Sequence, residues 1–217
     1  MISQDEAFRV QDELRARLVI PSEPVAVPPT VVGLDVTYEV GSDRAVAAAV
    51  VVDVATLAVV EVAAFAGTTD FPYVPGLLAF REVPLLTAAI ERLTTTPELL
   101  VCDGYGLAHP RRFGLASHLG TLLDLPSYGV AKTPYVGTFD PPGPGRGDSS
   151  DLIDSGAVVG RVVRTREGVK PVFVSAGHRV GLADCAALTV RLSGRYRIPE
   201  PTRQADIESR RILREWQ

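Results

Sequence analysis

The stretch Val31-Val32-Gly33-Leu34-Asp35-Val36 places a carboxylate inside an apolar run, where acidic residues are unusual. A second run, Leu99-Leu100-Val101-Cys102-Asp103-Gly104, ends on another Asp. Glu82 lies four residues from both Leu78 and Leu86, so on a helix it shares their apolar face. A buried and unpaired carboxylate is costly. Three of them on segments that meet in one core therefore predict a neutralising divalent cation.

The composition predicts one globular domain over residues 1–217. The chain has 46% hydrophobic residues, 22% charged residues and a net charge of −4, which argues against disorder and against a protein that coats nucleic acid non-specifically. No signal peptide opens the chain and no apolar run approaches the ~20 residues of a membrane span, so we expect a cytoplasmic protein with no membrane partner. Cys102 and Cys185 are too far apart for a zinc ribbon, and we expect both to be reduced core residues.

The hydrophobic pattern predicts an α/β protein. An N-terminal helix and a proline-rich connector occupy residues 1–29, and a flexible surface loop is expected over 140–151. The expected strands are 31–38, 45–54, 57–66, 98–103, 126–131, 157–164 and 171–176. Further helices are expected over 76–93, 112–123, 181–193 and 202–215. The first three strands predict an antiparallel meander, and the strands that then alternate with helices predict parallel strands, giving a mixed sheet with helices on both faces.

Several familiar site motifs are incomplete in this chain. Gly104-Tyr105-Gly106 follows a strand, but the third glycine of a dinucleotide-binding fingerprint would fall on His109. His109, His118 and His178 are too widely spaced to form a helical zinc pair. The seven Arg of residues 191–217 outnumber four acidic residues, 7 − 4 = +3, which fits either a phosphate-backbone partner or a solvated charged helix.

One constellation remains, and it is the order of four acids along the predicted elements. Asp35 is in the first strand, Glu82 on the helix after the meander, Asp103 at the end of the fourth strand and Asp206 on the last helix. Mg²⁺ and Mn²⁺ prefer carboxylate and water oxygens, and two-metal hydrolysis of a phosphodiester needs carboxylates that converge from several elements. This order resembles that of ribonuclease H-like nucleases.

Short sequence motifs narrow the resemblance to one family. The chain resembles the endonuclease V family, whose members nick nucleic acid near deaminated adenine, and the resemblance spans roughly 30–206. The matching words are GLDV (33–36), FPYVPGLLAFRE (71–82), VCDGYGLAHPRRFG (101–114), GVAK (129–132), AGHRV (176–180) and PEPTR (199–203). The words FPYVPG and DGYGLAHPRR are the most specific of these.

The resemblance implies a catalytic and metal-binding set. Asp35 and Asp103 would bind the metal, Glu82 would complete the carboxylate set, and Asp206 would occupy the fourth position. Lys132 and His109 would contact the scissile phosphate or the attacking water, which makes all six residues catalytic candidates: Asp35, Glu82, Asp103, His109, Lys132 and Asp206. The resemblance implies Mg²⁺ as the cofactor, with Mn²⁺ as a substitute.

The resemblance also implies a substrate-contacting set. Tyr73, held in the turn Pro72-Tyr73-Val74-Pro75, would be a wedge that stacks where the base has left the helix. Aromatic stacking returns ~1–3 kcal/mol per base, comparable with the cost of flipping. Three arginines would hold phosphates, namely Arg81, Arg111 and Arg112. Three residues would border the flipped hypoxanthine, namely Leu78, Gly104 and Gly106.

The sequence therefore predicts a Mg²⁺-dependent, monomeric endonuclease that acts on DNA containing deoxyinosine. By resemblance it would hydrolyse the second phosphodiester bond 3′ of the lesion and leave a 3′-hydroxyl and a 5′-phosphate. Alternatives are a nuclease for inosine-containing RNA or branched nucleic acid, and an inosine-binding module without chemistry. Individual residues also have structural alternatives, since Tyr73 could pack over a turn, Lys132 could be a surface charge, and Glu82 could pair with a basic neighbour.

Overall fold

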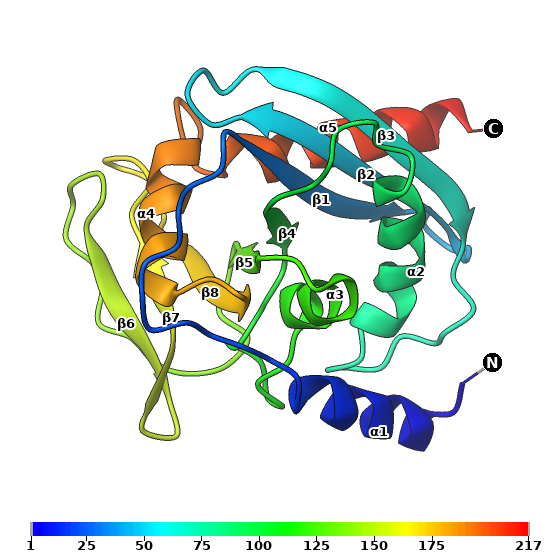
Figure 1. The fold of residues 1–217 in the computed structure, drawn as a ribbon, viewed down its shortest axis with the longest axis horizontal. Coiled ribbons are helices and arrows are strands. Elements are labelled where there is room, and N and C mark those ends of the chain that lie inside the picture. Colours follow the sequence, from blue (N-terminus) through cyan, green and yellow to red (C-terminus); the bar gives the residue numbers. More distant parts are fainter. Residues whose placement is uncertain (1, 217) are drawn as a thin grey trace.

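The fold is built on one mixed sheet that runs through the whole molecule. The computed structural model describes residues 2–216, so Met1 and Gln217, the ends of the predicted domain, lie outside it. Within these residues, eight strands form the sheet in the order β3-β2-β1-β4-β5-β8-β7-β6, with helices packed against it (Figure 1). No helix among them is long and apolar enough to cross a bilayer.

The first three strands form the predicted antiparallel meander. β1 (Thr30–Tyr38) pairs with β2 (Arg44–Asp53), and β2 pairs with β3 (Val59–Thr68). β2 is buried on both faces, and its alternate residues enter different cores, with Ala47 and Ala49 on one side and Ala48 and Val50 on the other. An apolar run of this kind suits a strand that is covered by helices on both faces.

Beyond the meander the sheet is parallel and then antiparallel again. β4 (Leu100–Asp103) and β5 (Ser127–Ala131) lie parallel to β1, as predicted. β8 (Val172–His178), β7 (Ala157–Val163) and β6 (Ser149–Asp154) then pair antiparallel. The mixed sheet is confirmed, and it carries this second antiparallel group in addition.

Strand β6 corrects the predicted boundaries of the loop over 140–151. Residues 149–151 are the first half of a strand, and the polar sequence Ser149-Ser150-Asp151 carries no apolar alternation by which it could be recognised. Pairing with β7 imposes the extended conformation there. Tertiary context commonly overrides weak local β-propensity in this way.

Helices cover both faces of the sheet. α2 (Ala79–Ile90) and α3 (Leu115–Leu123) enclose one core, while α4 (Leu182–Leu192) and α5 (Glu200–Glu215) pack on the opposite face. α1 (Gln4–Arg15) lies against α3 at the outside of the sheet, and its connector runs past α4 to reach β1 (Figure 1).

Two prolines mark the helices that carry predicted site residues. Pro84 lies inside α2, which begins at Ala79, three residues later than predicted, so Glu82 sits in its first turn. α5 begins at Glu200, two residues earlier than predicted, with Pro201 in its first turn, where a missing N–H is harmless. The carbonyl group of Pro201 faces β1, where a Cβ added at Gly33 would come within 2.1 Å of it.

We predict that Gly33→Ala is strongly destabilising. The added Cβ would meet backbone atoms at the start of α5, and neither these atoms nor the backbone of β1 can move aside. Overpacking of this kind costs roughly 1–3 kcal/mol or more in the free energy of unfolding, measurable by urea denaturation. Gly181→Ala is the matched control, since an added Cβ there meets its nearest atom at 3.4 Å. Equal loss of stability in the two variants would contradict the predicted role of this contact.

Candidate functional site

The four predicted acids come from four elements that meet at one end of the sheet. In the parallel pair β1 and β4, Leu34 is in register with Cys102, so Asp35 and Asp103 each follow a paired position on adjacent strands. Glu82 reaches the same region from α2, and Asp206 from α5 on the opposite face. The electrostatic environment of Asp35 includes both Asp103 and Asp206, and that of Glu82 includes Asp35 and Asp103.

Asp35 is held by the last helix. The Ser209 hydroxyl lies 3.1 Å from Asp35 Oδ2 and 2.7 Å from the hydroxyl of Thr37, so Thr37 can donate to Ser209 while Ser209 donates to Asp35. Burial, followed by the charges of Asp103 and Asp206, raises the pKa of Asp35 to about 7. The hydroxyl of Ser209 opposes this shift without overcoming it.

Glu82 is the most deeply buried of the acids. Its side chain accepts a hydrogen bond from the Tyr38 hydroxyl at 3.2 Å. Burial and then the charge of Asp35 raise the pKa of Glu82 to about 8. Leu86 lies in the core as expected, but Leu78 lines a cavity instead, because the helix begins only after it.

Arg210 pairs with Asp206 at 2.8 Å, and Lys132 supplies a second cation that contacts this group. Its Nζ donates to Asp103 Oδ2 at 2.6 Å from the end of β5, with its side chain 49% exposed. Burial disfavours the ammonium, but the hydrogen bond and charge of Asp103 outweigh burial and raise the pKa of Lys132. Lys132 is thus a half-exposed lysine paired with a predicted metal ligand, and its contact with the scissile phosphate or the attacking water stays a prediction.

The donor chemistry of this carboxylate group suits a divalent cation. Its members are oxygen ligands, which Mg²⁺ and Mn²⁺ prefer. Burial, followed by the charges of neighbouring carboxylates, raises the pKa of Asp35 and of Glu82. Among residues 2–216, no three His, Cys, Asp or Glu side chains converge closely enough to hold a metal ion. These carboxylates fit the cation in donor chemistry alone, and their role as metal ligands stays a prediction.

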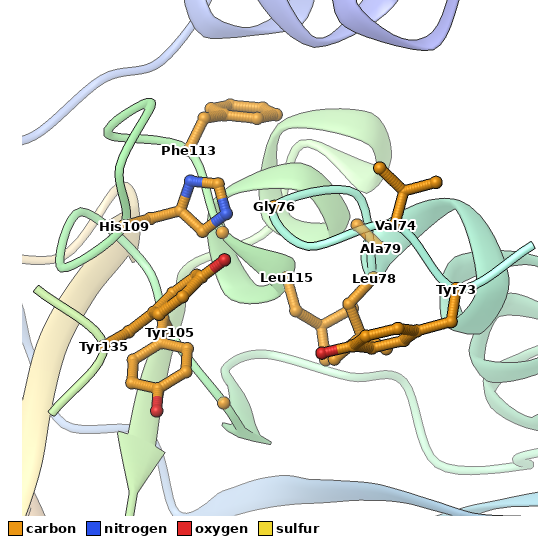
Figure 2. Close-up of a pocket in the computed structure, with 12 residues that line it drawn as sticks. Tyr73, Val74, Gly76, Leu78, Ala79, Tyr105, His109, Phe113, Leu115 and Tyr135 are labelled. Atoms are coloured by element: carbon orange, nitrogen blue, oxygen red, sulfur yellow. The ribbon is translucent and has the colours of Figure 1, made fainter. Parts of the chain in front are cut away.

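Next to the carboxylates lies a cavity of about 220 Å³ with largely apolar walls (Figure 2). Gly104, the neighbour of Asp103, lies on its wall at φ +151°, a conformation that favours glycine. Tyr73 stands on one side of the cavity and His109, Tyr105 and Tyr135 on the other (Figure 2). The complete lining comprises Tyr73, Val74, Gly76, Leu78, Ala79, Gly104, Tyr105, His109, Phe113, Gly114, Leu115 and Tyr135.

The aromatic walls of this cavity differ in exposure. Tyr73 is 70% exposed, so its ring does not simply pack over the turn. On the opposite side, the ring of Tyr135 lies 5.3 Å from that of Tyr105 and 5.4 Å from that of His109. Tyr135 was not predicted from the sequence, because a single aromatic residue in the loop after β5 has no distinguishing pattern.

His109 belongs to the cavity, and among residues 2–216 no hydrogen bond or ion pair joins it to the carboxylates. Its ring is buried against Tyr135, and its Nδ1 accepts from the backbone N–H of Arg111 at 3.2 Å. Burial, followed by the charge of Arg111, lowers the pKa of His109 to about 4, so its ring is neutral near pH 7. A contact between His109 and the scissile phosphate stays a prediction.

Gln11 on α1 ties together the two loops that form the cavity, and sequence analysis did not identify it. Its side chain is 1% exposed, and Nε2 donates to the carbonyls of Gly76 at 3.1 Å and Phe113 at 2.9 Å. Arg15 adds a hydrogen bond to the carbonyl of Arg111 at 3.2 Å. The helix outside the sheet therefore fixes the spacing of the cavity walls.

Other predicted substrate residues have internal partners. Arg111 forms an ion pair with Asp12 at 2.7 Å, and Arg112 pairs with Asp154 on β6. Arg81 donates to the carbonyl of Phe71 and lies over the Tyr38 ring. Pro72 and Pro75 flank Tyr73 without lining the cavity, and Gly106 is buried, where an added Cβ would meet the carbonyl of Ala176 at 2.0 Å. Phosphate contacts by these arginines stay predictions.

A mixed sheet that brings one acid from its first strand, one from its fourth strand and one from each of two helices to a single end defines a ribonuclease H-like nuclease. The endonuclease V family model matches residues 12–207, so the chain belongs to the endonuclease V family. Membership makes the protein a hydrolase of phosphodiester bonds.

Relatives of known sequence and structure agree with this assignment. The endonuclease V of Streptomyces coelicolor is 57% identical over 215 residues, covering 98% of this chain and 92% of the relative. The crystal structure of the Streptomyces avermitilis endonuclease V superposes with a TM-score of 0.95 at 53% identity, covering 99% and 95% of the two chains. A third relative, the endonuclease V of Ciona intestinalis, was crystallised with a 24mer DNA containing an inosine followed by a ribo-adenosine. It superposes with a TM-score of 0.86 at 28% identity, covering 98% of both chains.

Raised carboxyl pKa values predict that the metal-free protein loses stability as pH rises. Above about pH 6.5 both carboxyls are ionised in the unfolded chain, whereas folded Asp35 and Glu82 release their protons only near pH 7 and 8. The buried side chains of His109 and His118 act at lower pH. Burial lowers the pKa of each to about 4, so the fold loses stability as pH falls below 6.5. In a chelator, we expect the free energy of unfolding to fall by about 2 kcal/mol between pH 6.5 and 8.

Urea denaturation of the wild type and of the Asp35→Asn, Glu82→Gln double variant checks this prediction. The neutral side chains should flatten the pH dependence over this window. Parallel curves for the two proteins would show that these carboxyls are not the source of the effect.

Proposed function

We propose that this nuclease recognises deoxyinosine in DNA and hydrolyses the second phosphodiester bond 3′ of the lesion, leaving a 3′-hydroxyl and a 5′-phosphate. The observation that carries the proposal is the junction of Asp103 and Gly104, because one residue belongs to the carboxylate group and the next lines the base-sized cavity. A base held in the cavity would present its own strand to the carboxylates.

The cavity suits a flat, uncharged base. Its walls are mostly apolar and aromatic, and neutral His109 adds no charge. Enzymes that read a damaged base extrude it into such a pocket, and the cost of unpairing is lowest for a base that pairs weakly. The Ciona intestinalis relative, crystallised with DNA containing an inosine, supports hypoxanthine as that base.

We propose that Mg²⁺, with Mn²⁺ as a substitute, is held by Asp35, Asp103 and Glu82, with Asp206 at the fourth position. When bound, such a cation supplies electrostatic stabilisation of the charge that develops on the phosphate. The ammonium of Lys132, already held at Asp103, would add positive charge on the phosphate side of the group. Ser209 would orient Asp35, and Tyr38 would orient Glu82.

We further propose that residues 1–217 act as one nuclease domain and as a monomer. Inosine-containing RNA is the second candidate substrate, and the DNA of the Ciona intestinalis complex, with its ribo-adenosine after the inosine, is the observation that favours testing it. An inosine-binding module without chemistry is disfavoured, because binding alone gives no reason to bury ionisable acids at the cost described above.

Cleavage of an end-labelled duplex with one deoxyinosine, in Mg²⁺ and in EDTA, tests the proposed function. We expect a Mg²⁺-dependent nick at the second bond 3′ of the inosine, and a loss of at least about a hundredfold in Asp35→Ala, since removing one preorganised electrostatic group commonly costs that much. Asp5→Ala, at an exposed site on α1, is the matched control and should cleave like the wild type. Intact substrate with folded wild-type protein in both Mg²⁺ and Mn²⁺ would exclude the proposed activity.

A wedge role for Tyr73 predicts a specific loss in substrate binding. Tyr73→Ala removes a stacking surface worth ~1–3 kcal/mol, so KM for inosine-containing DNA should rise about fivefold to a hundredfold. The melting temperature should change little, because the ring is 70% exposed. Tyr73→Phe keeps the ring and should restore KM to near the wild-type value, and a failure of Phe to do so would point to the hydroxyl instead of the ring.

A further inference from the structure

A second groove lies beyond Lys132, and none of the roles described so far uses it. It encloses about 310 Å³. Its walls come from the segment after β5, from residues 139–148 before β6 (the Pro-rich loop) and from the start of β8. The residues lining it are Lys132, Thr133, Pro134, Phe139, Pro141, Pro142, Arg164, Lys170, Pro171, Phe173 and Arg197.

Two half-buried arginines hold the walls of this groove by hydrogen bonds to backbone carbonyls. Arg197 donates to the carbonyls of Lys132, Lys170 and Pro171, each at 2.8 Å, and so holds the ends of β5 and β8 together. Arg164 donates to the carbonyls of Gly143 at 2.6 Å and Pro142 at 3.2 Å, which fixes the Pro-rich loop as the facing wall. The groove is therefore held by specific contacts.

The chemistry of the groove is that of a nucleic-acid backbone site. Its four charged lining residues are all basic, namely Lys132, Arg164, Lys170 and Arg197. Lys170 is exposed, and Phe139 is 36% exposed with its ring packed edge-on against Phe173 at 5.2 Å. Cationic grooves with aromatic platforms bind single strands through phosphate contacts and base stacking.

The position of the groove gives the direction of the strand. Lys132 lines it and also contacts Asp103, whose neighbour Gly104 lines the base cavity. The carboxylate group thus stands between cavity and groove. A strand whose lesion occupies the cavity and whose cut lies over the carboxylates must continue past Lys132.

We propose that this groove binds the segment of the cleaved strand that lies 3′ of the cut, with Lys170 on a phosphate and Phe139 against a base or sugar. The inference rests on the proposed function, because the lesion in the cavity defines which side of the cut is 3′. The groove would be an additional subsite. It would contribute to affinity for the uncut strand and would release the segment 3′ of the cut once the bond is broken.

A length series tests the subsite. The substrates are duplexes whose inosine strand ends roughly two, four, six or ten nucleotides past the cut, with a constant complementary strand. For the wild type, we expect kcat/KM to rise about tenfold as the strand lengthens and then to level off. In Lys170→Ala and Phe139→Ala, the ratio between the longest and shortest substrates should fall toward one.

Salt dependence separates the phosphate contact from a structural effect. Lys170→Ala should lower the slope of log KM against log salt by ~1 for the long substrate only, while Phe139→Ala should leave the slope unchanged. Arg9→Ala is the matched control, since Arg9 is an exposed arginine on α1 outside the groove, and it should keep the wild-type length ratio.

Each outcome bears on a different claim. A wild type that cleaves no inosine substrate contradicts the proposed function itself. A wild type that cleaves all lengths equally, or a length effect that survives in both groove variants, overturns the subsite while leaving the proposed function intact. Melting temperatures of the variants, which should match that of the wild type, show that a lost length effect does not come from unfolding.

Discussion

Parallel pairing between β1 and β4 is the constraint on which the functional end of this molecule depends. The register that aligns Leu34 with Cys102 sets Asp35 and Asp103 on neighbouring strands, directed toward the same helix-covered face. Slipping either strand by one residue would turn its acid to the opposite face. The meander on one side and β5 on the other hold this register, and the contact of Gly33 with Pro201 docks α5 so that Ser209 reaches Asp35.

This arrangement concentrates like charges where folding would otherwise avoid them. Two acids keep their protons to near neutral pH, and the group is in contact with the cations of Lys132 and Arg210. Sites that carry out chemistry commonly store unfavourable electrostatics of this kind, which the rest of the fold must stabilise. Here the compensation comes from a sheet whose central strands are buried on both faces, with β2 wholly enclosed between two cores.

The location of the candidate site was largely predictable from sequence, because acids inside apolar runs are rare and conspicuous. The meander, the mixed sheet and the meeting of Asp35, Glu82 and Asp103 followed from periodicity and from those three positions. Strand β6 was not predictable, since its polar residues are extended only through pairing with β7. The ion pairs of Arg111 and Arg112 within the protein were also not predictable, because the sequence around an arginine does not show whether it pairs with a carboxylate of the protein or with a phosphate. Gln11 and Tyr135 belong to segments whose neighbours in space are far away in the chain.

Because Gln11 anchors the cavity, the spacing of the cavity walls and the placement of the acids depend on different parts of the molecule. The acids sit on the sheet and on helices packed directly against it, whereas the walls of the cavity are spaced by a helix that joins the sheet through a proline-rich tether. Under the proposed function, changes in α1 or its tether would alter the choice of base without altering the proposed catalytic acids. The range of lesions accepted could then change during evolution while the hydrolytic chemistry stayed constant.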